Sequence, residues 1–143
     1  MKSLLACLLL VLASDCAAAA SATPACPTLP PDAHARVVSD LGVDSLECDV
    51  VSVPAKEPLF SVYVGNHPDV PRDLRYGGTT VSKQRNLVWF FVPDGHVFGK
   101  RTWRTFLPTG HRSMSVAMVW FTANGQSEFT QRAELVAQLQ LPQ

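Results

Sequence analysis

The chain has 143 residues, and its 12 basic side chains balance 12 acidic ones, so its formal net charge is zero. This length is sufficient for one domain with a hydrophobic core. A neutral balance argues against a nucleic-acid-binding protein, because affinity for nucleic acid depends on excess positive charge. We therefore expect no nucleic-acid partner.

The first residues have the features of a secretory signal peptide. Lys2 gives a basic start, an apolar stretch follows, and Ala20 and Ala22 offer cleavage sites after small residues. The apolar stretch is too short for a permanent membrane span. We predict a cleaved leader over residues 1–22, one domain over residues 23–143, and a periplasmic or secreted protein.

A lipid anchor is the alternative to soluble export. Cys16 is well placed for lipid attachment, but Asp15 precedes it where lipoprotein signals normally carry a small residue. Soluble export is the preferred interpretation. The protein would be attached to a membrane only if Cys16 were lipidated.

Cys26 and Cys48 are the cysteines that remain after the leader. Two cysteines in an exported protein are most simply one disulfide, and no Cys-x-x-Cys spacing suggests a redox pair. The bond would close a loop of about 22 residues and stabilise the fold by around 3 kcal/mol.

The first half of the domain predicts a helix and two strands. Ala33, Val37 and Leu41 recur at a spacing of four, which predicts a short helix over residues 31–41 that ends before Gly42. Residues 48–53 and 59–64 are rich in β-branched and aromatic side chains, which predicts strands.

The domain is organised around the apolar residues 87–92. Both faces of this segment are apolar, so we expect a strand in the middle of the sheet, with residues 114–121 as its neighbour. A polar turn over residues 83–86 predicts a hairpin with the strand before it. Residues 97–107 mix basic and apolar side chains, which favours an edge strand.

A second helix is predicted at the end of the chain. It opens at Gln126 or Ser127, and Phe129, Ala133 and Val136 lie on one arc. The order of elements predicts an α+β fold: a single antiparallel sheet of about five to six strands with an N-terminal and a C-terminal helix packed on it.

Charge is unevenly distributed along the chain. Residues 26–69 are mainly acidic and residues 70–112 mainly basic. If the halves stay apart, the surface has an acidic and a basic region that steer a charged partner. The favoured interpretation is that the sheet brings the halves together and the charges pair or are solvated.

The stretch over residues 65–78 is long, turn-rich and bracketed by apolar strands, which is typical of a functional loop. His67 lies near Asp69 and is a weak candidate for a general base. The simpler interpretation is an exposed histidine in a capped turn. Candidate binding residues here are Asn66, His67, Asp69, Arg72, Arg75 and Tyr76.

A second group of candidate binding residues mixes cations with an aromatic ring: Arg101, Trp103 and Arg104. Such a group could contact an anionic polymer or an acidic protein surface. The simpler interpretation is an edge strand whose basic side chains block unwanted pairing.

No catalytic, phosphate-binding, dinucleotide-binding or metal-binding motif is present in the sequence, so we expect no cofactor and no metal. The resulting hypothesis is an exported, non-enzymatic binding protein, of the inhibitor or immunity type, directed at a toxin or cell-wall-degrading enzyme. It implies a protein partner in the cell envelope. The alternatives are a small hydrolase-like envelope enzyme that uses His67, and a structural or assembly accessory module of the envelope.

Overall fold

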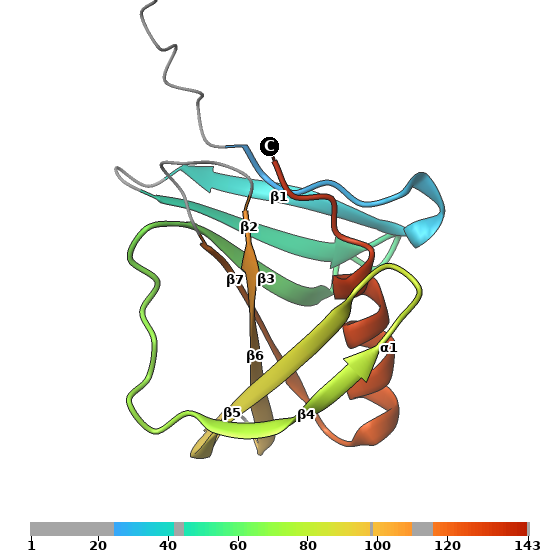
Figure 1. The fold of residues 1–143 in the computed structure, drawn as a ribbon. Helices are drawn as coiled ribbons and strands as arrows, with labels where there is room; N and C mark the ends of the chain where they lie inside the picture. Colours follow the sequence, from blue (N-terminus) through green and yellow to red (C-terminus); the bar gives the residue numbers. More distant parts are fainter. Residues whose placement is uncertain (1–24, 42–44, 98, 110–115, 143) are drawn as a thin grey trace, which may run out of the picture.

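The computed structural model describes residues 25–41, 45–97, 99–109 and 116–142 (Figure 1). The predicted leader lies outside the described residues. In chain order the elements are η1 (Pro31–Ala33), β1 (Ala35–Leu41), β2 (Ser45–Ser52), β3 (Pro58–Gly65), β4 (Arg75–Val81), β5 (Asn86–Val97), β6 (Lys100–Pro108), β7 (Val116–Ala123) and α1 (Gln126–Ala137).

All seven strands belong to one antiparallel sheet in the order β1-β2-β3-β7-β6-β5-β4. The strands β1 to β3 and β4 to β6 form two meanders, and β7 joins them by pairing with β3 and β6. The single antiparallel sheet is confirmed. The expected five to six strands were too few, because a segment predicted as a helix is a strand.

The helix predicted over residues 31–41 is wrong. Only η1 is helical, and His34 follows it with a left-handed backbone (φ 49°) that ends the turn before β1. The spacing of Ala33, Val37 and Leu41 misled because four is close to one helical turn and is also a multiple of the strand period of two. Val37 pairs with Val50 of β2 and contacts the core.

The predicted neighbours of two strands are also wrong. β5 lies second from the edge, between β6 and β4, and does not pair with β7. β6 was expected at an edge and lies in the interior. Alternation along a strand predicts its two faces but carries little information about which strand pairs with it.

The sheet curves around α1, which covers its inner face (Figure 1). The confirmed C-terminal helix contributes Ala133, Val136 and Ala137 to the core, all with exposed fractions of 0%. Phe129 of α1 meets the rings of Trp89 and Trp103, with centroids 5.4 Å and 4.5 Å away. Burial of this apolar surface is the main force that holds helix and sheet together.

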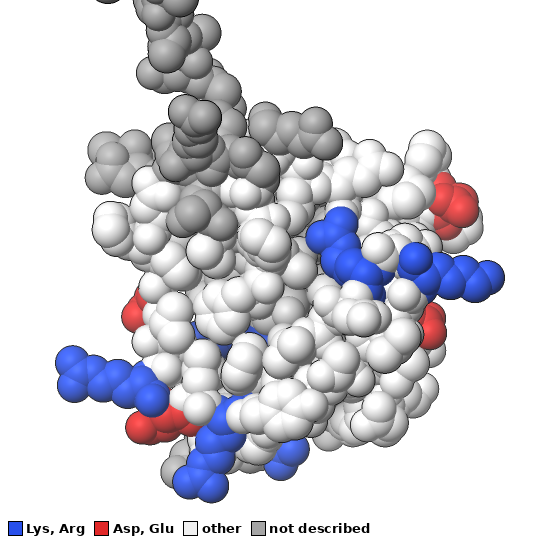
Figure 2. Space-filling model, in the orientation of Figure 1, with Lys and Arg blue, Asp and Glu red and all other residues white. Residues whose placement is uncertain are grey.

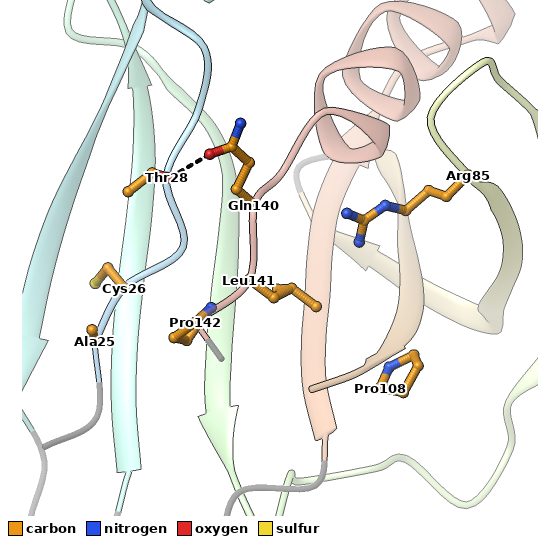
Figure 3. Close-up of a pocket in the computed structure, with 8 residues that line it drawn as sticks. All are labelled: Ala25, Cys26, Thr28, Arg85, Pro108, Gln140, Leu141 and Pro142. Atoms are coloured by element: carbon orange, nitrogen blue, oxygen red, sulfur yellow. Dashed lines mark hydrogen bonds between the residues drawn. The ribbon is translucent and has the colours of Figure 1, made fainter. Parts of the chain in front are cut away.

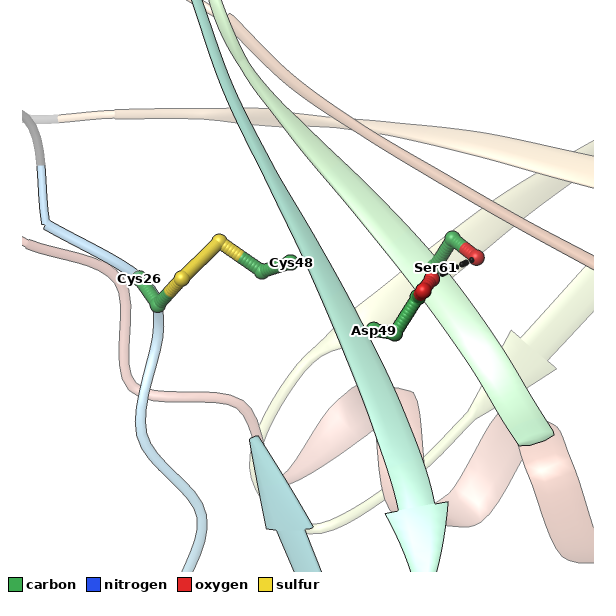
Figure 4. The surroundings of a disulfide bond; sticks show 4 residues. All are labelled: Cys26, Cys48, Asp49 and Ser61. Carbon is green, nitrogen blue, oxygen red and sulfur yellow. Dashed lines mark hydrogen bonds between the residues drawn. A yellow bond between two sulfur atoms is a disulfide. The ribbon is translucent and has the colours of Figure 1, made fainter. Parts of the chain in front are cut away.

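The predicted disulfide between Cys26 and Cys48 is confirmed. It fixes the segment before β1 to β2, rather than fixing a helix to the first strand (Figure 4). On β2 the side chains alternate: Cys48 is buried on the inner face, whereas Asp49 projects outward and accepts a 2.6 Å hydrogen bond from the hydroxyl of Ser61.

Candidate functional site

Loop 66–74 joins β3, in the interior of the sheet, to β4 at its edge, and so passes β7, β6 and β5. Figure 1 shows the loop on the side of the sheet opposite α1. The helix therefore covers one face of the sheet, and the loop lies over part of the other, where Val38 and Val88 stay exposed. Asn66, His67, Asp69 and Arg72 lie on the loop, while Arg75 and Tyr76 begin β4.

Burial along loop 66–74 repeats every three residues. Pro68, Pro71 and Leu74 are partly buried, and the two residues before each of them are exposed. Three residues per turn is the period of a polyproline II segment, a conformation that proline favours because its ring fixes φ. The loop thus turns one side chain in three toward the sheet and presents the other two to solvent.

Tyr63 of β3 holds the start of the loop. Its hydroxyl accepts a long hydrogen bond of 3.4 Å from the backbone N–H of His67. Gly65 permits this arrangement, because a Cβ at that position would overlap the tyrosine ring. At the other end, Asp73 and Leu74 line a cavity of about 280 Å³ together with residues of β5.

Arg104 of β6 lies on the outer face below the loop, opposite Phe90 and Trp120 in the strand register. Burial lowers the pKa of Arg104, and the negative charge of Asp69 acts in the opposite direction. Its Nε is buried and has no hydrogen-bond partner among the described residues. The side chain stays protonated, so a fixed cation lies beneath the loop and attracts Asp69.

His67 and Asp69 are both exposed, and no hydrogen bond joins their side chains in the described structure. A general base is normally held and oriented by a partner within hydrogen-bond reach. The hypothesis of a hydrolase that uses His67 stays a prediction. Among the described residues, no side-chain hydrogen bond orients His67 as a base.

The second predicted group divides between the two faces of the sheet. Arg104 points outward, while Trp103 points inward and packs against Phe129. Trp103 is partly buried on an interior strand rather than exposed on an edge. No motif in the sequence marks Phe129 or Tyr63 as part of either site. Strand alternation could have indicated Tyr63, since it faces away from the buried Val62 and Val64.

The acidic and basic halves supply different ends of the sheet, but Asp69 of loop 66–74 lies near Arg104 of β6. The strand order places β1 to β3 at one end of the sheet and β4 to β6 at the other. Between described residues the ion pairs are Lys100–Glu128 and Arg132–Glu128, and neither joins the two meanders. The favoured interpretation, that the sheet brings the halves together and the charges pair or are solvated, stays a prediction. Figure 2 shows Lys and Arg side chains projecting from the lower part of the molecule and from its right side, with acidic side chains near both groups.

A cavity of about 870 Å³ lies between the two terminal segments and the β4–β5 turn (Figure 3). Thr28 and Gln140 join the two terminal segments through backbone hydrogen bonds of 2.9 Å and 3.0 Å. The guanidinium of Arg85 is occupied, because it donates a 2.5 Å hydrogen bond to the carbonyl of Leu139. The cavity walls offer no set of converging catalytic groups.

Within the described ranges, no group of three or more His, Cys, Asp or Glu side chains is placed to hold a metal ion. None of the helices in the same ranges has the length and apolar character needed to cross a membrane.

Glu128 stabilises the first turn of α1. Its carboxylate accepts a 2.8 Å hydrogen bond from the N–H of Asn124, which lowers the pKa of Glu128; the charges of Arg132 and Lys100 act in the same direction. A carboxyl group with a lowered folded-state pKa stabilises the fold above its unfolded-state pKa. That contribution disappears as the pH falls through the folded-state pKa.

We expect Glu128→Gln to lower the free energy of unfolding by about 1 kcal/mol at pH 7, and by less at a low pH, below the lowered pKa of Glu128, where the wild-type carboxyl is also protonated. Urea unfolding at both pH values measures the difference. Glu134→Gln, an exposed position on the same helix, is the control and should change stability little. An equal loss at both pH values would show that the charge of Glu128 is not the cause.

Comparison with known proteins assigns no family to the chain: no protein-family model matches it, and neither a curated protein nor a solved structure is significantly similar to it.

Proposed function

We propose that this chain is an exported, non-enzymatic binding protein that contacts a protein partner of the cell envelope, as an inhibitor or immunity protein does. Loop 66–74 is the observation that supports the proposal. Tyr63 holds the start of its backbone at His67, and two of every three of its side chains face solvent. A loop that is ordered before binding loses little conformational entropy on binding, which favours tight association.

The exposed side chains of this surface suit a protein interface. Val70 and Tyr76 are large apolar residues with exposed fractions of 44% and 65%. Arg72 and Arg75 lie beside them in the chain, and both are exposed. Tyrosine and arginine are enriched among the residues that dominate binding energy. We therefore define the proposed interface as loop 66–74 with Arg75 and Tyr76.

A matched pair of double variants tests this interface. Val70→Ser with Arg72→Ser removes one apolar and one basic side chain from the loop. Val38→Ser with Arg36→Ser makes the same changes on β1, at the opposite edge of the sheet, where Val38 is similarly exposed (46%). We expect the loop variant to weaken partner binding at least tenfold, because truncating one central interface residue commonly costs more than 1 kcal/mol.

The partner is first isolated with the protein from the envelope fraction of its own cells, and its affinity for the purified variants is then measured by calorimetry. The β1 variant should bind as the wild type does. Equal binding by the two variants would place the interface elsewhere. If no protein co-purifies in a stoichiometric amount, the proposal of a protein partner fails.

A further inference from the structure

A second site lies on the inner side of the sheet, where β5 turns into β6 and α1 begins. A cavity of about 290 Å³ there is lined by Arg101, Trp103, Phe129 and residues 123–126. Side chains alternate along β6, so this cavity and Arg104 are on opposite sides of the sheet. The site is independent of the interface proposed above.

The aromatic wall of the cavity is fixed by its surroundings. The ring of Trp103 lies 4.5 Å from that of Phe129 and 5.6 Å from that of Phe91, measured between centroids. Gly77 of β4 permits this position, because a Cβ there would overlap the ring of Trp103. The wall is therefore formed before any ligand binds.

Arg101 adds a fixed positive charge. Its guanidinium carbon lies 4.6 Å from the centroid of Phe91 and 5.7 Å from that of Trp103. Stacking on aromatic rings occupies a face of the guanidinium but leaves the N–H groups at its edge free to donate. Among the carboxylates whose side chains the structure describes, none forms an ion pair with Arg101; the ion pairs found there involve Lys100 and Arg132.

Glu128, the acidic residue of the first turn of α1, does not compete for Arg101. One of its oxygens accepts from the N–H of Asn124, and the other lies 2.6 Å from Arg132 and 3.6 Å from Lys100. Its charge is therefore compensated within the protein. The cavity thus combines an apolar aromatic wall with one cation that has no acidic partner in the described structure.

We propose that this cavity binds a carboxylate attached to a single aromatic ring, with the carboxylate on Arg101 and the ring against Trp103 and Phe129. Planar guanidinium groups pair with carboxylates through two parallel hydrogen bonds. The volume is at the small end for ligand sites and suits on the order of ten non-hydrogen atoms. A free aromatic acid and the C-terminal residue of a peptide both have this chemistry.

Two probes that differ only in charge test the site. The full chain is titrated with phenylacetate and with phenylacetamide, and the indole NMR signal of Trp103 is followed. We expect the acid to bind at least about tenfold more tightly than the amide, because a charge-assisted pair is replaced by a neutral contact. N-acetylphenylalanine serves as the second acid: tighter binding than phenylacetate indicates a peptide end, and weaker binding indicates a free acid.

Two variants separate the charge from the cavity. Arg101→Gln should remove the preference for the acid, while Arg72→Gln, which removes a cation from the opposite face, should keep it. Gln126→Trp adds a large side chain at the exposed rim and should block both probes. Three results would each overturn the proposal: no saturable binding, equal affinity for acid and amide, or an acid preference that survives Arg101→Gln.

Discussion

Trp89→Ala should lower the free energy of unfolding by about 3–5 kcal/mol, the range measured when large aromatic side chains are removed from protein cores. Trp89 has an exposed fraction of 0%. Its ring meets Phe121 and Phe129 edge-on, at 5.1 Å and 5.4 Å between centroids. Its indole N–H donates a 3.0 Å hydrogen bond to Thr80. The truncation would leave a cavity where β4, β5, β7 and α1 meet.

Urea unfolding followed by far-UV circular dichroism measures this loss without depending on tryptophan fluorescence. Trp120→Ala is the matched control, because Trp120 lies on the outer face and is only partly buried. Trp120→Ala should lower the free energy of unfolding by clearly less than Trp89→Ala does. If both variants lost the same amount, the core would not be concentrated on the inner face.

Replacing both Cys26 and Cys48 by alanine should lower the free energy of unfolding by about 3 kcal/mol, because the bond closes a 22-residue loop and limits the freedom of the unfolded chain. Cys48 has an exposed fraction of 0%, and the smaller alanine side chain makes no new contact there that would offset the loss of the bond. The segment that carries Cys26 should become the least protected part of the fold in hydrogen exchange.

Reductant supplies the control for this double variant. The wild type in a strong thiol reductant should fall to nearly the stability of the variant, and the variant should not respond to reductant at all. A variant as stable as the oxidised wild type would mean that other contacts, such as the backbone hydrogen bonds between Thr28 and Gln140, and not the covalent bond, fix this segment.

The sequence allowed those features of the fold to be predicted that depend on local patterns. Alternation over residues 87–92 indicated a strand with two apolar faces, and the arc through Phe129, Ala133 and Val136 indicated the C-terminal helix. Residues 31–41 were predicted wrongly because a spacing of four fits both a helix and a strand. Strand order could not be predicted, because it depends on contacts between distant segments.

Only those parts of the candidate site that depend on local sequence patterns could be predicted. A loop over residues 65–78 was predicted from its length and its position between apolar strands, but it spans only residues 66–74, because β4 begins at Arg75. The interaction of Asp69 with Arg104 could not be predicted, because the whole β4–β5 hairpin separates these two residues in the sequence. The cavity beside Arg101 needs Phe129, which comes from α1 and is brought there only when the helix covers the sheet.

The position of β7 has a consequence for the order of folding. Each meander consists of consecutive strands and needs only local contacts, whereas β7 is the last strand in the chain and pairs with both. Until residues 116–123 are available, β3 and β6 each have a free edge, and free edges pair readily with other chains. A chain truncated before β7 would therefore leave two small sheets prone to aggregation in place of one closed domain.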